Sequence, residues 1–339
     1  MTTLDDRVRS AVDELVEGAG LSRQQRDLVV SIFETVVQLA TTDHDTLDLK
    51  IADTALAEMA EAFEVFHPWR ATPKVTMFGS ARTAPDDPIY VLARDLARQL
   101  ATEGWMIVTG AGPGIMAAGT EGAGRDRSFG VNIRLPHEQG ANAFIAQDPK
   151  LVEMRFFFTR KLMLIKESHA YVVLPGGFGT LDECFELLTL LQTGKAEPAP
   201  VVLVETPGEG FWHAWLRFVE EEVVSRGYVS APDLAFFRIA TSVEEACSEI
   251  QRYYRNYHSA RWVGDLLVLR VHRLPGDEAL ARLSEEFSDI LRSGPIRATQ
   301  PLPPERSAGD LLELERVALR FDKVSYARLR GLIDALNEF

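Results

Sequence analysis

Short apolar runs alternate with helical patterns throughout residues 71–256, and this alternation restricts the possible folds more than any other feature of the chain. The runs "KVTMF", "WMIV", "AYVV" and "PVVLV" are typical of buried strands, while stretches such as "DPIYVLARDLARQL" carry apolar side chains at helical spacing. Strands that alternate with helices form parallel sheets with right-handed crossovers. We therefore predict a doubly wound, Rossmann-like α/β domain over 71–256.

Two further segments flank this domain. Residues 1–70 carry apolar side chains at three- and four-residue spacing and predict a helical N-terminal extension. Residues 257–339 predict a small α+β unit of the order strand, helix, strand, helix, in which the strands cover 262–274 and 314–323 and a proline-rich loop lies between them. This unit shows no catalytic pattern, so we expect an oligomerisation or regulatory role for it.

Charge and composition exclude several classes of protein. The 339 residues include 36 basic and 50 acidic ones, a net charge of -14, whereas nucleic-acid binders usually carry basic faces. No segment approaches the roughly 20 apolar residues of a membrane span, and the N-terminus lacks the apolar core of a signal peptide. Cys184 and Cys247 are not spaced as a zinc site or a disulfide framework. We expect a cytoplasmic protein that binds no nucleic acid, membrane or metal.

Glycine-rich turns follow several of the expected strands: "FGSAR" at 78–82, "TGAGPGIM" at 109–116 and "LPGGFGTLDE" at 174–183. In an open α/β sheet such turns converge beyond the carboxyl ends of the strands. Glycine lets backbone amides approach a phosphate, and the following helix N-terminus adds positive potential, although a plain tight turn also favours glycine. The candidate phosphate- or substrate-binding residues of these turns are Gly79, Ser80, Gly110, Gly112, Gly114, Gly176, Gly177, Gly179 and Thr180.

The common cofactor motifs do not fit these turns. The dinucleotide fingerprint G-x-G-x-x-G/A, started at Gly110, requires glycine or alanine at position 115, where the chain has Ile115. No Lys-Ser/Thr pair follows the glycines, so a Walker-type loop is excluded as well. We expect no cofactor.

Charged residues lie close to the turns in sequence. Glu183 is expected in the first turn of the helix that follows "PGGFGT", where a carboxylate suits the helix dipole without any function; alternatively, it contacts ribose hydroxyls or an attacking water. Arg160 and Lys161 are expected at the start of another helix, where cations are electrostatically unfavourable. Either an anion binds near them or they form a solvated face.

With these residues the chain resembles the LONELY GUY (LOG) family, long taken for lysine decarboxylases. The family signature P-G-G-x-G-T-x-x-E is present as Pro175 to Glu183, with the upstream Arg-Lys pair at Arg160 and Lys161. The resemblance covers about 74–245 and implies a homodimer or larger homo-oligomer. It also implies hydrolysis of the N-glycosidic bond of a nucleoside 5′-monophosphate, with Arg160 and Glu183 as the catalytic pair and the 176–180 turn around the 5′-phosphate.

The sequence leaves open which nucleotide the protein binds and whether it hydrolyses that nucleotide. Compact family members often have Met-His where this chain has Phe157 and Phe158, which either stack on a base or belong to the core, so AMP and cytokinin riboside 5′-monophosphates both remain candidates. A pyridoxal-phosphate decarboxylase is disfavoured because no lysine is marked for a Schiff base. The alternative is a protein that binds a nucleotide or phosphorylated cofactor without hydrolysing it.

Overall fold

The computed structural model describes residues 4–135 and 140–339. The chain forms two compact units, Met1–Ala60 and Glu61–Phe339. Within the described residues, no helix combines the length and the apolar character needed to cross a bilayer.

The first unit is helical, as the sequence predicts. Helix α1 (Leu4–Leu15) packs on α2 (Arg23–Thr41) through a small core of Val8, Val12 and Val30. Ser22 begins α2 with a capping box, because its hydroxyl accepts a hydrogen bond from the Gln25 amide while the Gln25 side chain accepts one from the Ser22 amide. Helix α3 (Thr46–Phe66) follows, and its residues up to Ala60 belong to this unit.

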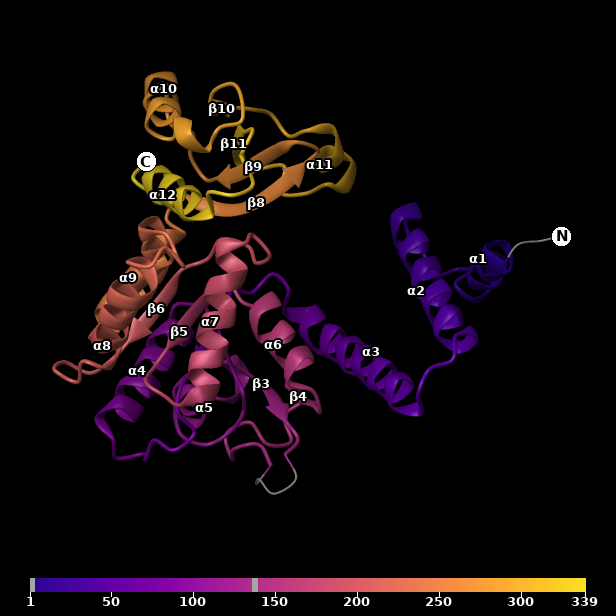
Figure 1. The fold of residues 1–339 in the computed structure, drawn as a ribbon, viewed down its shortest axis with the longest axis horizontal. Helices are drawn as coiled ribbons and strands as arrows, with labels where there is room; N and C mark the ends of the chain where they lie inside the picture. The colour runs from indigo at the N-terminus through magenta and orange to yellow at the C-terminus, as the bar shows by residue number, and fades with distance from the viewer. Residues whose placement is uncertain (1–3, 136–139) are drawn as a thin grey trace. The chain divides into compact units, whose positions relative to one another are not determined.

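The second unit contains the predicted doubly wound parallel sheet (Figure 1). Its strand order is β4-β3-β2-β1-β5-β6-β7, and every neighbouring pair is parallel. The strands are β1 (Lys74–Phe78), β2 (Met106–Thr109), β3 (Ser128–Ile133), β4 (Leu151–Met154), β5 (Ala170–Val173), β6 (Val201–Val204) and β7 (Phe237–Ala240).

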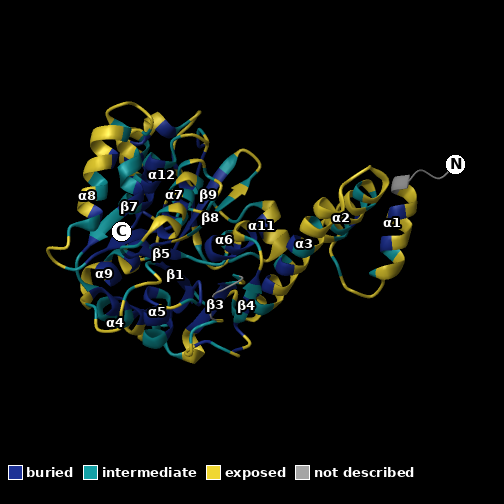
Figure 2. Ribbon diagram, turned by 60° about the horizontal axis from the view of Figure 1, so that its bottom comes forward, coloured by how far each residue is buried: buried dark blue, intermediate teal, exposed yellow. Residues whose placement is uncertain are grey.

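Helices cover both faces of this sheet, and the strands are accordingly buried (Figure 2). Alternate strand residues such as Met77 and Val172 join one core with α4 (Pro88–Thr102), α5 (Ile115–Ala123) and α9 (Val243–Tyr253). On the opposite face, the hydroxyls of Thr76 and Tyr171 donate hydrogen bonds to carbonyls of α6. The helices that follow β4, β5 and β6 are α6 (Phe157–Lys166), α7 (Phe178–Gln192) and α8 (Phe211–Phe218), the last continued by a π-helical turn, Val219–Val224.

Short 3-10 helices complete the connections: His67–Trp69, Arg125–Arg127, Ala231–Phe236 and Ser288–Ile290.

The C-terminal residues form a four-stranded antiparallel sheet, β10-β11-β9-β8. Apolar residues of one face, such as Leu269 and Val317, pack against Leu283 and Ile333 of two helices. The elements are β8 (Tyr257–Val263), β9 (Leu266–Val271), α10 (Asp277–Glu286), β10 (Arg297–Ala298), α11 (Pro303–Ala308), β11 (Glu315–Leu319) and α12 (Tyr326–Leu336).

This small sheet corrects the predicted strand over 262–274. The apolar run is a hairpin: Val263 pairs with Leu266 across a two-residue turn, and Gly264 has φ +61°. The proline-rich loop also contains α11 and the short β10. The unit is α+β as predicted, whereas the boundaries of 71–256 and 257–339 as separate domains stay a prediction.

Candidate functional site

The strand order places a topological switch point between β1 and β5. From β1 the chain adds β2, β3 and β4 on one side, and then crosses to the other side of β1 to form β5. The connections that leave β1 and β5 therefore diverge at the carboxyl edge of the sheet. Ligands of open α/β sheets bind in the crevice at this point.

The three glycine-rich turns meet at this switch point. The Ser80 amide donates a hydrogen bond to Pro175 O at 3.1 Å, and the Ile115 amide donates to Ser80 O at 3.0 Å. A side chain on Gly114, which has φ +63°, would lie 2.3 Å from Ser80 O, and one on Gly176 would lie 2.2 Å from Thr180 Oγ1. The close packing of the turns thus requires glycine at these two positions.

The remaining predicted turn residues lie around the same point. A Cβ on Gly79 would lie 2.6 Å from Ile115, and one on Gly112 would meet only the flexible end of Met116, at 2.7 Å. Thr180 is buried.

Helix α7 begins earlier than predicted. Its first residue is Phe178 and its N-cap is Gly177, so Gly179 and Thr180 belong to the first helical turn. The amides of this turn have no acceptor within the helix, and the Gly177 cap supplies no side-chain oxygen. A Cβ on Gly177 or Gly179 would meet nothing within 4 Å. The fold itself does not need glycine there, and the missing side chains leave the amides accessible.

The Arg160 side chain contacts strand β3, the turn at Gly110 and helix α7. It is buried, with Nε donating to Val131 O of β3 at 2.9 Å and Nη2 donating to Gly110 O at 3.4 Å. Nη1 lies 3.4 Å from Glu183 Oε1 on α7. A Cβ on Gly110 would lie 1.8 Å from Nη2, so glycine at this position makes room for the guanidinium.

Glu183 lies in the second turn of α7 rather than the first, because the helix begins at Phe178. Burial raises the pKa of its carboxyl from 4.5 to about 7, although the neighbouring Arg160 acts to lower it. A carboxyl whose pKa is near neutrality exchanges protons readily at physiological pH. The dipole of the first turn therefore does not explain Glu183, since that turn contains no acidic residue.

Lys161 takes part in a different interaction from the one predicted for it. Its Nζ forms ion pairs of 2.7 Å with both Asp182 and Glu186 of α7. Burial acts to lower the pKa of Lys161, but these two carboxylates outweigh it and raise that pKa. Lys161 joins α6 to α7, and its role toward a phosphate stays a prediction.

Phe157 and Phe158 are not core residues: their exposed fractions are 52% and 56%. They lie at the N-terminus of α6, in the turn before Arg160.

The structure adds one polar cluster that sequence reasoning missed. Glu205, which directly follows β6, is buried and accepts a hydrogen bond from the Trp212 amide at 2.6 Å, and its other oxygen contacts His213 Nδ1. The only sequence signal was an acidic residue at the end of the apolar run "VVLV". Glu205 caps the N-terminus of α8.

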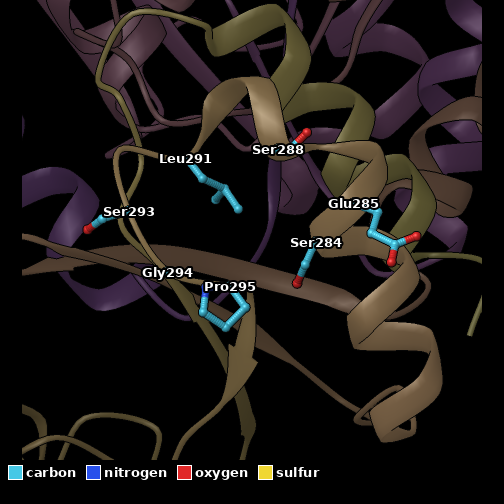
Figure 3. A pocket seen from close by; sticks show the side chains of 7 residues that line it. All are labelled: Ser284, Glu285, Ser288, Leu291, Ser293, Gly294 and Pro295. Carbon is cyan, nitrogen blue, oxygen red and sulfur yellow. The ribbon is translucent and has the colours of Figure 1, made fainter.

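A surface hollow of about 560 Å³ lies elsewhere, on the small α+β unit (Figure 3). It contains one charged side chain, that of Glu285, and no residue of the glycine-rich turns, so it is separate from the candidate site. The hollow is lined by Ser284, Glu285, Ser288, Leu291, Ser293, Gly294 and Pro295.

Among the residues that the structure describes, no cluster of three or more histidine, cysteine or carboxylate side chains is arranged to hold a metal.

Comparisons with known proteins agree with the motifs. Residues 113–250 match the family model described as possible lysine decarboxylase. A cytokinin riboside 5′-monophosphate phosphoribohydrolase of Arabidopsis thaliana is 33% identical over 28% of this chain and 42% of its own length. A probable enzyme of the same name from Oryza sativa subsp. japonica is 26% identical over 48% of this chain and 75% of its own length.

Among solved structures, a molybdenum cofactor binding protein from Rippkaea orientalis is 19% identical, with 53% of this chain and 96% of that chain covered and a TM-score of 0.39. The part of this chain that matches the Arabidopsis phosphoribohydrolase covers less than half of that enzyme's length. The family model and the phosphoribohydrolase relatives confirm that this chain resembles the LOG family, as the segment from Pro175 to Glu183 indicates.

Proposed function

We propose that the protein hydrolyses the N-glycosidic bond of a nucleoside 5′-monophosphate, AMP or a cytokinin riboside 5′-monophosphate, to the free base and ribose 5-phosphate. The observation that carries this proposal is the contact between the buried Arg160 and the partly buried Glu183, beside the glycine-rich turns at the switch point. The similar proteins named as phosphoribohydrolases support the same reaction.

The first turn of α7 binds the 5′-phosphate in this proposal. The amides of Phe178, Gly179 and Thr180 lack acceptors within the helix, and the helix dipole favours an anion there. Gly177 and Gly179 present no side chain that would hold a phosphate away. The turns with Gly79, Ser80, Gly110, Gly112, Gly114 and Gly176 complete the substrate-binding wall.

Glu183 then acts on the sugar. As the bond between C1′ and the base nitrogen breaks, its electron pair leaves with the base and positive charge develops on the ribose. The Glu183 carboxylate stabilises this charge and accepts the proton of the water that attacks C1′, as carboxylates do in glycoside hydrolysis. That proton then passes to the departing base, so the products are the neutral base and ribose 5-phosphate. Its raised pKa of about 7 suits proton transfer at neutral pH. Arg160 stabilises the phosphate or the departing base.

The flanking segments keep supporting roles in this proposal. Residues 71–256 carry the chemistry, while 1–70 and 257–339 serve assembly or regulation in a cytoplasmic homo-oligomer.

Incubation with a panel of nucleoside 5′-monophosphates, followed by chromatography of the released base, tests the proposal. We expect release by the unmodified protein, release at least a hundredfold slower by Glu183→Gln, and normal release by the matched control Asp182→Asn, which changes the adjacent carboxylate that pairs with Lys161. Tight nucleotide binding without any released base would instead support a non-hydrolytic binding protein.

A further inference from the structure

Two exposed aromatic side chains near the candidate site have no aromatic partner among the described residues. Phe157, the first residue of α6, is 52% exposed, and Phe178, the first residue of α7, is 94% exposed. Phe158 differs from them because its ring stacks on Phe156 at 5.2 Å. Among the described residues, neither Phe157 nor Phe178 has a ring contact. Burial of these two rings by a bound group would be favourable, because it removes apolar surface from water.

The ion pairs of Lys161 place these two rings on facing sides of neighbouring helices. Helices α6 and α7 lie side by side, both beginning at the carboxyl edge of the sheet (Figure 1). Phe157 precedes Lys161 by four residues and Phe178 precedes Asp182 by four, so each ring lies about one turn above its member of the 2.7 Å ion pair. Side chains of a helix lean toward its N-terminus, which directs both rings toward the mouth of the site.

Long side chains rather than close backbone contact join the two helices here, since Lys161 reaches across to Asp182 and Glu186. A planar ring system held between two others needs them about 7–8 Å apart, twice the contact distance between carbon atoms. Next to the Lys161–Asp182 pair on the same two helices lies the Arg160–Glu183 pair. A planar group held by the rings would therefore be adjacent to the catalytic pair.

We propose that Phe157 and Phe178 form an aromatic clamp that stacks on both faces of the nucleobase. This inference rests on the proposed function and names the part of the substrate that these helices recognise. Stacking depends on the π-face that every base has, so the clamp selects for a planar base and discriminates weakly between bases. Nucleotide affinity thus has two sources, the amides of the α7 turn for the phosphate and the clamp for the base.

Titration calorimetry with AMP and with ribose 5-phosphate tests the clamp, with Phe157→Ala and Phe178→Ala each made in the Glu183→Gln protein so that AMP is not consumed during the titration. Each variant should bind AMP between about fivefold and a hundredfold more weakly, while its affinity for ribose 5-phosphate, which lacks a base, stays unchanged. Phe218→Ala is the matched control, because Phe218 is similarly exposed, at 53%, but lies at the end of α8. This control, made in the same protein, should bind both ligands like Glu183→Gln alone.

Unchanged AMP affinity in both variants would overturn the clamp. Equal weakening of AMP and ribose 5-phosphate would also overturn it, because the substitutions would then act on the phosphate turn. A change of oligomeric state in light scattering, with AMP affinity unaltered, would show that the rings contact a second copy of the chain instead.

The clamp and the proposed function fail in different ways. If the unmodified protein binds AMP without releasing adenine while the variants bind it more weakly, the hydrolase proposal fails and the clamp stands. If the unmodified protein releases the base and the variants keep the AMP affinity of Glu183→Gln alone, the clamp alone fails. No binding of any nucleoside 5′-monophosphate would contradict both.

Discussion

Two arginine–glutamate contacts in different regions of this molecule have carboxylates that differ in their surroundings. In the small α+β unit, Glu305 accepts hydrogen bonds from Arg270 at 2.9 Å, from Arg316 at 3.3 Å and from the Leu302 amide at 3.0 Å. At the sheet edge, the Arg160–Glu183 contact is 3.4 Å long. Glu305 is surrounded by donors, whereas among the described residues Glu183 has one long contact, to Arg160.

The pKa values follow this difference. Burial acts to raise the pKa of Glu305, but the Leu302 amide and the two guanidinium groups outweigh it and lower that pKa. For Glu183, burial dominates and raises the pKa to about 7 against the effect of Arg160. The Glu305 cluster therefore has the properties of a structural ion pair, which holds α11 on the sheet. The Glu183 pair has those expected of a reactive group.

Replacement of Glu183 should have the largest effect on activity. For Glu183→Gln we predict a loss of roughly 10²–10⁴-fold in the rate of base release, the usual contribution of a general base. The melting temperature should not fall, because the substitution removes a buried carboxyl that burial destabilises. Initial rates and thermal unfolding measure both quantities. A variant that keeps its rate would remove the distinction between the two carboxylates.

Replacement of Glu305 should lower the stability of the protein and leave the activity of the folded molecules unchanged. Glu305→Gln leaves Arg270 and Arg316 buried without a counter-charge, so we predict a decrease of about 3–5 kcal/mol in the free energy of unfolding. Denaturant titration measures it. The folded fraction should still release base at the normal rate per molecule. If stability is unaffected, the cluster is not what holds α11 in place.

The Glu183 pair should also make stability depend on pH. Because the folded state raises this pKa from 4.5 to about 7, the folded protein binds more protons than the unfolded chain in that interval. The stabilisation that proton binding to Glu183 gives the folded state is therefore fully present below about pH 4.5 and is lost as the pH rises to about 7. In total it changes the free energy of unfolding by about 3 kcal/mol. Comparison of the unmodified protein with Glu183→Gln by denaturant titration across this range isolates the effect. Parallel stability curves for the two proteins would argue against a raised pKa.

Substitutions of two adjacent glycines of the α7 turn should have smaller effects, one on stability and the other on activity. A Cβ on Gly176 would lie 2.2 Å from Thr180 Oγ1, so Gly176→Ala should destabilise the fold by about 1–3 kcal/mol. A Cβ on Gly177 meets nothing within 4 Å. Gly177→Ala should therefore keep the melting temperature but release base about tenfold or more slowly, because the phosphate is displaced. A Gly177 variant of full activity would place the phosphate elsewhere.

The sequence predicted the parts of this molecule that depend on local patterns. The alternation of apolar runs and helical stretches was sufficient for the parallel sheet, and "PGGFGT" for the turn beside the site. The hairpin of β8 and β9 was missed because the turn at Gly264 lies inside one apolar run. The start of α7 was placed two residues late because Phe178, an apolar residue in a glycine-rich stretch, gives no helix-start signal.

Interactions across long sequence separations were not predictable. Arg160 and Glu183 were singled out by their expected helix positions, and the resemblance made them a catalytic pair. Nothing in their spacing shows that they touch or that burial raises the pKa of Glu183. The pairing of Lys161 with two carboxylates and the cluster around Glu305 depend on which helices and strands become neighbours. Only the folded chain specifies these contacts.

The pH dependence of base release tests the central claim most directly, because it reports the protonation of the group that performs the reaction. At nucleotide concentrations far below KM, where the rate reports the free protein, it should rise about tenfold per pH unit below pH 7 and level off above it, since the reaction needs the Glu183 carboxylate in its charged form. A rate that is independent of pH between 5 and 8, in a protein that releases base, would show that a different group activates the water.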